Sequence, residues 1–311
     1  MEQRHLGRSG PKVSEIGLGC NNFGILDIES SRKVVHRALD LGVTLFDTAD
    51  VYGNRGGSET QLGEILGPRR KDIVLATKFG MAMDDRGSGG ASRRYIMSAC
   101  EASLKRLKTD WIDLYQVHRF DNETPIEETL SALDDLVRQG KVRHIGCSNF
   151  AAAQVVDAQR TAKDRGFSAF VSAQDEYSLL ARDIERELVP TLEAQGLGLL
   201  PYFPLASGLL TGKYSRGKDV PQGTRMALMK RLSDRFMTEK NWEIVDRLGA
   251  FCERRGHSML ELAFSWLLAK PVVASVIAGA TKPEQIEANV KARGWKLSAD
   301  DLAEIDRITR T

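Results

Sequence analysis

Four side chains that can transfer or stabilise protons lie at or just after the ends of three consecutive apolar segments. Asp47 ends the first segment and Tyr52 follows it, Lys78 ends the second, and His118 ends the third. A single Asp or His in such a place often has a capping or structural role. Four of them from neighbouring segments favour one common site, because the carboxyl ends of barrel strands meet at one mouth.

The chemistry of these four residues is coherent. A tyrosine hydroxyl, with an ordinary pKa of about 10, is a better proton donor to a carbonyl oxygen when a cation lowers that pKa. We expect Lys78 to be that cation and Asp47 to fix the position of its ammonium group. His118 would hydrogen-bond the substrate oxygen and orient it beside Tyr52. The sequence has no nucleophilic Ser or Cys beside a base and no His-Glu-x-x-His motif, so the site needs a hydride source, which indicates a nicotinamide.

The elements that must position these residues alternate between short apolar runs and amphipathic helical patterns, which is typical of repeated βα units. Eight runs predict strands, at residues 16–19, 44–46, 73–77, 111–117, 144–147, 170–174, 198–202 and 274–278. Patterns with 3.6-residue spacing predict helices at 30–41, 59–66, 92–107, 126–139, 151–162, 184–194 and 242–254, with extra ones at 259–269 and 300–308. A turn at residues 8–11 predicts a hairpin that closes the lower end of the barrel.

These elements predict an α/β protein, a single (β/α)8 TIM barrel domain over residues 1–311, with an N-terminal β-hairpin and extra C-terminal helices. A doubly wound sheet is the rival, because Gly17-Leu18-Gly19 resembles the start of a dinucleotide fingerprint. Asn22 occupies the third glycine position, and no helix opens directly there, which favours the barrel. A long polar loop at 204–237 follows the seventh strand, and loops of that length usually carry function.

Composition narrows the partner to a small molecule. The chain is 42% hydrophobic and 28% charged, its net charge is only +2, and its basic residues are dispersed, so neither nucleic acid nor a membrane is expected to bind. No secretory leader is evident, and four scattered cysteines without a C-x-x-C pair suit a reducing compartment. We expect a cytoplasmic protein with no metal, and a homo-oligomer stays open.

The segments Phe46-Asp47-Thr48-Ala49-Asp50-Val51-Tyr52-Gly53, Gln116-Val117-His118, Gly146-Cys147-Ser148-Asn149-Phe150 and Gly208-Leu209-Leu210-Thr211-Gly212-Lys213-Tyr214, together with Lys78, resemble the aldo/keto reductase superfamily. The resemblance spans nearly the whole chain. It is closest to the bacterial branch that includes general-stress reductases and the β subunits of voltage-gated potassium channels. It implies a (β/α)8 barrel, NADPH without metal, and a catalytic tetrad of Asp47, Tyr52, Lys78 and His118.

The resemblance also implies a cofactor site. Ser148, Asn149 and Gln174 would bind the nicotinamide carboxamide, and Tyr202 would stack on its ring. The loop after it would clasp the pyrophosphate, while Lys282 at a helix N-terminus would favour NADPH over NADH by binding the 2′-phosphate. A solvated surface lysine is the alternative for Lys282. The full cofactor set is Gly19, Asn21, Asp47, Ser148, Asn149, Gln174, Tyr202, Phe203, Pro204, Leu205, Ser207, Gly208, Lys213, Arg225, Gly279, Thr281, Lys282, Gln285 and Asn289.

Candidates for a substrate pocket follow strand ends by a few residues: Phe23, Phe79, Met81, Arg119 and Phe120. Core packing is the alternative for the apolar ones. Arg119 would select an acidic or phosphorylated substrate, or else form a salt bridge with Asp121 or Glu123. Phe203 stands where many relatives carry Ser, which removes a hydroxyl near the pyrophosphate. The glycine-rich stretch 84–91 is either a lid or a simple mobile loop.

The sequence therefore predicts reduction of aldehydes, ketones or sugars with NADPH, with Tyr52 as proton donor. A regulatory module that senses the nicotinamide redox state, as the channel β subunits are thought to do, is the first alternative. A metal-dependent barrel hydrolase using Asp47 and His118 is the second.

Overall fold

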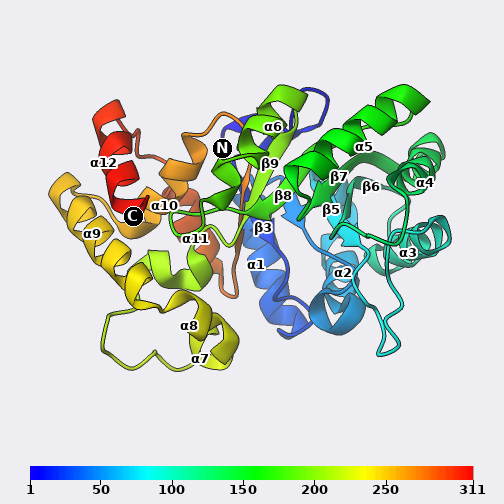
Figure 1. Ribbon diagram of the computed structural model, residues 1–311. Helices are drawn as coiled ribbons and strands as arrows, with labels where there is room; N and C mark the ends of the chain where they lie inside the picture. The colour runs from blue at the N-terminus through cyan, green and yellow to red at the C-terminus, as the bar shows by residue number, and fades with distance from the viewer. Residues whose placement is uncertain (311) are drawn as a thin grey trace.

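The protein folds around one parallel sheet closed into a barrel. In this computed structural model, which describes residues 1–310, eight strands pair in the order β10-β3-β4-β5-β6-β7-β8-β9. The backbone of Leu199 in β9 donates to Val272 and accepts from Ala274, next to β10, and so closes the ring. Helices surround the strands in Figure 1. The predicted (β/α)8 barrel is confirmed.

The strands lie where apolar runs predicted them, with small differences at their ends. Asp47 is the last residue of β4 itself, because its backbone continues the ladder beside Gly19 and Ala76. The strand bounds are β3 Ile16–Gly19, β4 Leu45–Asp47, β5 Val74–Phe79, β6 Ile112–Val117, β7 Val142–Ser148, β8 Phe170–Glu176, β9 Gly198–Tyr202 and β10 Val276–Gly279.

The predicted hairpin is confirmed, and it plugs the barrel. β1 (Gln3–His5) pairs antiparallel with β2 (Lys12–Ser14). Its fully buried Leu6 and Val13 pack against inward-facing side chains of the lower barrel, including Leu45, Leu114 and Leu200. The barrel interior is therefore sealed at its lower end by apolar contacts, and the carboxyl ends of the strands form its mouth.

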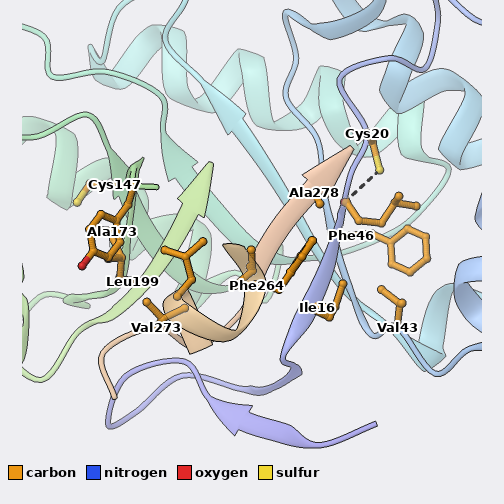
Figure 2. Close-up of a cluster of buried hydrophobic side chains, with 14 of the residues drawn as sticks. Ile16, Cys20, Val43, Phe46, Cys147, Ala173, Leu199, Phe264, Val273 and Ala278 are labelled. Carbon is orange, nitrogen blue, oxygen red and sulfur yellow. Dashed lines mark hydrogen bonds between the residues drawn. The ribbon is translucent and has the colours of Figure 1, made fainter. Parts of the chain in front are cut away.

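The helices cover the outside of the sheet. In α1, Asp27 caps the first turn by accepting from the Ser30 backbone at 2.9 Å, and Val34 and Val35 face the core. Figure 2 shows Phe264 of α10 among strand side chains such as Ile16 and Ala278. The helix bounds are α1 Ile28–Asp40, α2 Tyr52–Leu66, η1 Gly67–Asp72, α3 Arg93–Leu107, α4 Ile126–Arg138, α5 Ala152–Arg165, η2 Asp183–Glu185, α6 Leu188–Gln195, α9 Glu239–Arg255, α10 Met259–Leu268, α11 Pro283–Lys291 and α12 Ala299–Thr309.

Two predictions between the strands were wrong in detail. The segment 204–237 is not one polar loop: it contains η3 (Ala206–Thr211), α7 (Arg225–Leu228) and α8 (Lys230–Phe236), because its few apolar side chains, such as Met226 and Phe236, bury against the core. The helix predicted at 184–194 divides into η2 and α6. Pro190 can occupy only the first turn of a helix, so α6 cannot extend back to residue 184.

Within residues 1–310, no helix has the length and apolar composition needed to cross a bilayer.

Candidate active site

A buried ion pair forms the centre of the barrel mouth. The Lys78 ammonium group donates to Asp47 Oδ2 at 2.7 Å and to the Thr48 carbonyl oxygen at 2.9 Å. The Lys78 side chain is completely buried. Burial lowers its pKa, but the charges of Asp47 and Tyr52 outweigh that effect and raise the pKa above its ordinary value. Lys78 is therefore a fixed positive charge at neutral pH.

Two glutamine amides complete the shell around Asp47. Gln174 Nε2 donates to Asp47 Oδ1 at 2.9 Å, and Gln116 Nε2 donates to the same oxygen at 3.3 Å. Sequence reasoning had placed Gln174 near the nicotinamide and had given Gln116 no role. The period-two alternation of β6, which puts Gln116 on the same face as His118, could have identified it.

Tyr52 lies against both cationic and aromatic partners. The Lys78 Nζ is 5.0 Å from the centroid of the Tyr52 ring, and the His118 ring stands edge-on to it with centroids 5.7 Å apart. Tyr52 opens α2, but the next four residues have left-handed backbones, with φ of 65° at Gly53, 59° at Asn54, 66° at Arg55 and 114° at Gly56. This turn separates Tyr52 from the regular helix and holds it over the mouth.

Lys78 lowers the pKa of the Tyr52 hydroxyl, as expected, but it does not decide the net direction of the shift. Burial is the largest influence and raises the pKa of the Tyr52 hydroxyl above its ordinary value. Lys78 opposes this shift, and Arg225 does so more weakly, but desolvation wins. The phenol is therefore protonated at neutral pH, which is the form that a proton donor requires.

His118 is held as a neutral imidazole. Burial, followed by the charges of Lys78 and Arg119, lowers its pKa to about 3. Its backbone is fixed from both sides, since its N–H donates to the Phe79 carbonyl at 2.9 Å and its carbonyl accepts from Asn149 Nδ2 at 3.0 Å. A neutral histidine beside Tyr52 can hydrogen-bond a substrate oxygen without competing as an acid.

A chain of hydrogen bonds joins the residues expected to hold a nicotinamide. The Tyr202 hydroxyl donates to Asn149 Oδ1 at 2.8 Å, Asn149 Nδ2 donates to Ser148 Oγ at 2.9 Å, and Ser148 Oγ donates to the Gln174 carbonyl at 2.7 Å. Asn149 adopts a left-handed φ of 58°. These contacts orient a half-buried tyrosine ring beside the tetrad.

The loop after β9 has the chemistry of an anion cradle. Ser207 Oγ is buried without a hydrogen-bond partner in the described chain. Gly208 has a φ of 97°, which L side chains rarely adopt, and Lys213 Nζ lies 2.8 Å from where its Cβ would be. Arg225 stacks over Phe203 at 5.1 Å, and within residues 1–310 neither Lys213 nor Arg225 has a carboxylate partner. An unsatisfied hydroxyl and two unpaired cations fit a pyrophosphate.

The remaining cofactor candidates flank this cradle. Gly19 and Gly279 are paired in adjacent strands, and a Cβ on Gly279 would lie 3.3 Å from Asn21 Oδ1. Lys282 is exposed at the N-terminus of α11, and Gln285 Oε1 accepts from the Thr281 backbone at 2.7 Å. Pro204 and Leu205 lead into η3, and Asn289 is buried in α11.

The substrate-pocket candidates fall into two groups in the structure, those buried in the core and those at least partly exposed. Phe23 and Phe79 are fully buried in the main core, so they pack the barrel rather than face solvent. Met81 is partly exposed, and Phe120 packs edge-on against Phe150 at 5.1 Å. Arg119 is exposed, and among residues 1–310 it forms no ion pair with Asp121, Glu123 or any other acid.

Other polar groups fall outside the mouth. Asp113 pairs with Arg70 and Arg143 at the opposite end of β6, so this buried acid has a structural role. Across the described residues, no three His, Cys, Asp or Glu side chains gather as a metal site.

Comparisons with known proteins agree with this geometry. A model of the aldo/keto reductase family matches residues 15–310. An uncharacterised oxidoreductase of Bacillus subtilis, YrpG, is 39% identical over 99% of this chain and 96% of its own length. An L-glyceraldehyde 3-phosphate reductase of Escherichia coli is 36% identical over 99% and 92%. A probable voltage-gated potassium channel subunit beta of Oryza sativa is 37% identical over 94% and 91%. The chain therefore belongs to the aldo/keto reductase family.

Proposed function

We propose that this chain reduces aldehydes or ketones to alcohols with NADPH, as a single cytoplasmic domain. The observation that carries the proposal is the buried Lys78 ammonium group, paired with Asp47 and lying 5.0 Å from the Tyr52 ring centroid beside a neutral His118. In a barrel mouth this arrangement favours a carbonyl oxygen that gains negative charge.

Each residue has one task in this mechanism. The Tyr52 hydroxyl donates a proton to the carbonyl oxygen, and His118 hydrogen-bonds that oxygen and orients it. Lys78 stabilises the phenolate that Tyr52 becomes, while Asp47 and its two glutamine donors keep the ammonium group in place. The bound nicotinamide would supply a hydride to the carbonyl carbon, so carbonyl, NADPH and one proton give alcohol and NADP⁺.

The residues present suit NADPH. Ser207, Lys213 and Arg225 would hold the pyrophosphate, Tyr202 would lie against the nicotinamide, and exposed Lys282 at the head of α11 would bind the 2′-phosphate. NADH lacks that phosphate, so we expect it to bind less tightly. The reductases among the relatives, including one named for L-glyceraldehyde 3-phosphate and one for versiconal hemiacetal acetate, support carbonyl reduction.

A sensor of nicotinamide redox state is the second candidate, and the potassium channel β subunits among the relatives are the observation that favours it. A sensor needs cofactor binding but little turnover. All four tetrad positions of this chain carry the side chains that turnover requires, so the reductase is the stronger candidate.

The test is to titrate the purified chain with NADPH by fluorescence, and then to follow NADPH oxidation with aromatic, aliphatic and sugar aldehydes. We expect saturable binding and turnover of at least one class of aldehyde. Tight binding without turnover would favour the sensor. The absence of binding would overturn the cofactor proposal.

A further inference from the structure

Phe203 lies at the turn between β9 and η3 in a strained conformation. Its backbone is left-handed, with a φ of 51°, which an aromatic residue rarely adopts. Its ring is only partly buried. Such a backbone persists only where the surrounding contacts hold it, so the partners of the ring indicate what this turn does.

Three side chains from three different elements meet the Phe203 ring. Tyr202 of β9 stands edge-on to it with ring centroids 5.4 Å apart, and Phe236 of α8 does the same at 6.1 Å. The guanidinium carbon of Arg225, from α7, lies over the ring at 5.1 Å from its centroid. A small polar residue could make none of these contacts. Phe203 therefore joins the end of β9 to the two short helices.

Arg225 has no other partner that fixes its charged end. In the part of the chain that the structure describes, its guanidinium group forms neither a hydrogen bond nor an ion pair. Arg235 of α8, by contrast, pairs with Glu176 at 2.5 Å. A long arginine side chain loses conformational freedom when it is fixed, and a contact with an aromatic face offsets that loss. The Phe203 ring is thus what holds Arg225 in place.

The guanidinium group of Arg225 lies near both the tetrad and the anion cradle. Burial raises the pKa of the Tyr52 hydroxyl, and the charge of Arg225 is one of those that oppose this shift. Burial lowers the pKa of Arg225, and Tyr52 opposes that shift in turn. Both α7 and α8 pack against η3, which carries Ser207 and Gly208. Figure 1 shows these two helices at the end of the barrel away from the N-terminus.

The contact with Phe203 leaves the hydrogen-bonding groups of Arg225 available. A cation over a ring is attracted by the electrons of its face, and this contact uses none of the five N–H donors of the guanidinium group. Those donors can bind two phosphate oxygens side by side. Arg225 therefore combines a fixed position with free donors, which is the combination that an anionic ligand requires.

We propose that Phe203 is a positioning residue, whose ring holds the Arg225 guanidinium group ready for the pyrophosphate of the dinucleotide. Arg225 contacts the anion, and Phe203 acts only through Arg225. Because the cation is fixed before the ligand arrives, less conformational freedom is lost on binding and the affinity rises. The proposal rests on the NADPH-dependent function proposed above. It means that the loss of a serine hydroxyl at position 203 is compensated.

The experiment is a double-mutant cycle on cofactor affinity, measured by fluorescence titration with NADPH. Phe203→Leu keeps apolar bulk but removes the aromatic face, and it should raise the dissociation constant about 3- to 10-fold. Arg225→Ala should raise it about 10- to 100-fold. In the Arg225→Ala background, Phe203→Leu should have almost no further effect. Phe203→Tyr keeps the ring and should bind NADPH as the wild type does.

Inorganic pyrophosphate gives a second readout that involves neither the nicotinamide nor turnover. Calorimetric titration with this anion should show weaker binding by Phe203→Leu and by Arg225→Ala. NADPH and NADH share the pyrophosphate, so each variant should weaken the binding of both cofactors by the same factor. A mere loss of packing between α7, α8 and the barrel would not depend on the charge at position 225.

Phe251→Leu is the matched control, because Arg255 lies over the Phe251 ring at 5.6 Å. Both residues belong to α9, which carries none of the residues proposed to bind the cofactor. This variant loses the same kind of contact and should leave the dissociation constants for NADPH and pyrophosphate unchanged. Urea unfolding checks that each variant is folded.

An equal effect of Phe203→Leu with and without Arg225 would overturn the positioning role and leave the reductase intact. Binding of NADPH and pyrophosphate that Phe203→Leu does not change would do the same. The absence of NADPH binding by the wild type would instead overturn the proposed cofactor, and this role with it.

Discussion

The two ends of the barrel interior are built from the same strands but opposite chemistry. At the lower end, Leu45, Ala76 and Leu114 face inward and pack against Leu6 and Val13 of the hairpin. Two residues further along the same strands, the inward positions are Asp47, Lys78 and Gln116, which form a hydrogen-bonded network. Because side chains alternate with a period of two, one step of that period changes a sealed core into a polar site.

Backbone strain follows the same division. Among residues 1–310, every non-glycine residue with a positive φ except Lys108 lies in a segment that follows β4, β7 or β9 at the polar end: Asn54, Arg55, Asn149, Phe203, Ala206 and Ser207. Left-handed backbone costs about 1 kcal/mol or more at each such residue. The packed lower end supplies the stability that lets the mouth retain these conformations.

Tyr52→Phe should produce the largest effect, a loss of kcat that comes from the polar end alone. Loss of the proton donor should lower kcat by about 10³-fold, or about 4 kcal/mol, with little change in the NADPH dissociation constant. Tyr115→Phe is the matched control, because Tyr115 is also buried and its hydroxyl has no partner within the described chain. Loss of cofactor binding by Tyr52→Phe would contradict the assignment of this residue as donor.

Leu114→Ala should lower the stability of the apolar lower end and leave kcat unchanged. Leu114 is fully buried in the lower cluster, so truncation should lower the free energy of unfolding by about 3 kcal/mol. Urea unfolding measures this loss, and Leu228→Ala, whose side chain is 75% exposed, should change it little. A drop in kcat of the folded variant larger than that of the control would show that the two ends are coupled.

Asp50→Asn should remove the destabilisation that follows when the buried Asp50 carboxyl ionises. Burial and the nearby Glu59 raise the pKa of Asp50 to about 7, and neither carboxylate oxygen has a partner in the described residues. The folded pKa exceeds the unfolded value, so the stability from this group is present below about pH 4 and is lost as pH rises through 7.

Between pH 5 and pH 8 the wild-type chain should therefore lose about 3 kcal/mol through Asp50, and Asp50→Asn should lose correspondingly less. Unfolding measured across this range checks the slope. Asp110→Asn, at an exposed position, should keep the wild-type slope. Identical slopes in all three proteins would show that Asp50 is ionised in the folded state.

Lys282→Ala should have the smallest effect, at the rim. The loss of one exposed cation should weaken NADPH binding by about 1 kcal/mol, or about fivefold, and NADH binding less. Titration of both cofactors measures the difference. An equal change for both would remove the 2′-phosphate role of Lys282.

The amino-acid sequence by itself determined the eight strands and the hairpin, because these follow from local periodicity and turn residues. Residue types at strand ends also indicated the four side chains proposed as catalytic. Motifs spread over the chain indicated the family. The sequence did not predict the short helices in 204–237, because Met226 and Phe236 are isolated apolar residues whose burial depends on the surfaces that they meet.

Only the tertiary structure decided the electrostatics of the site. The sequence placed a cation near Tyr52, but the net direction of the Tyr52 pKa depends on how deeply the ring is buried. The sequence likewise left Arg119 between a salt bridge and a free charge. Hydrogen bonds from three neighbours occupy Asp121, and that competition for one carboxylate is visible only once the chain is folded.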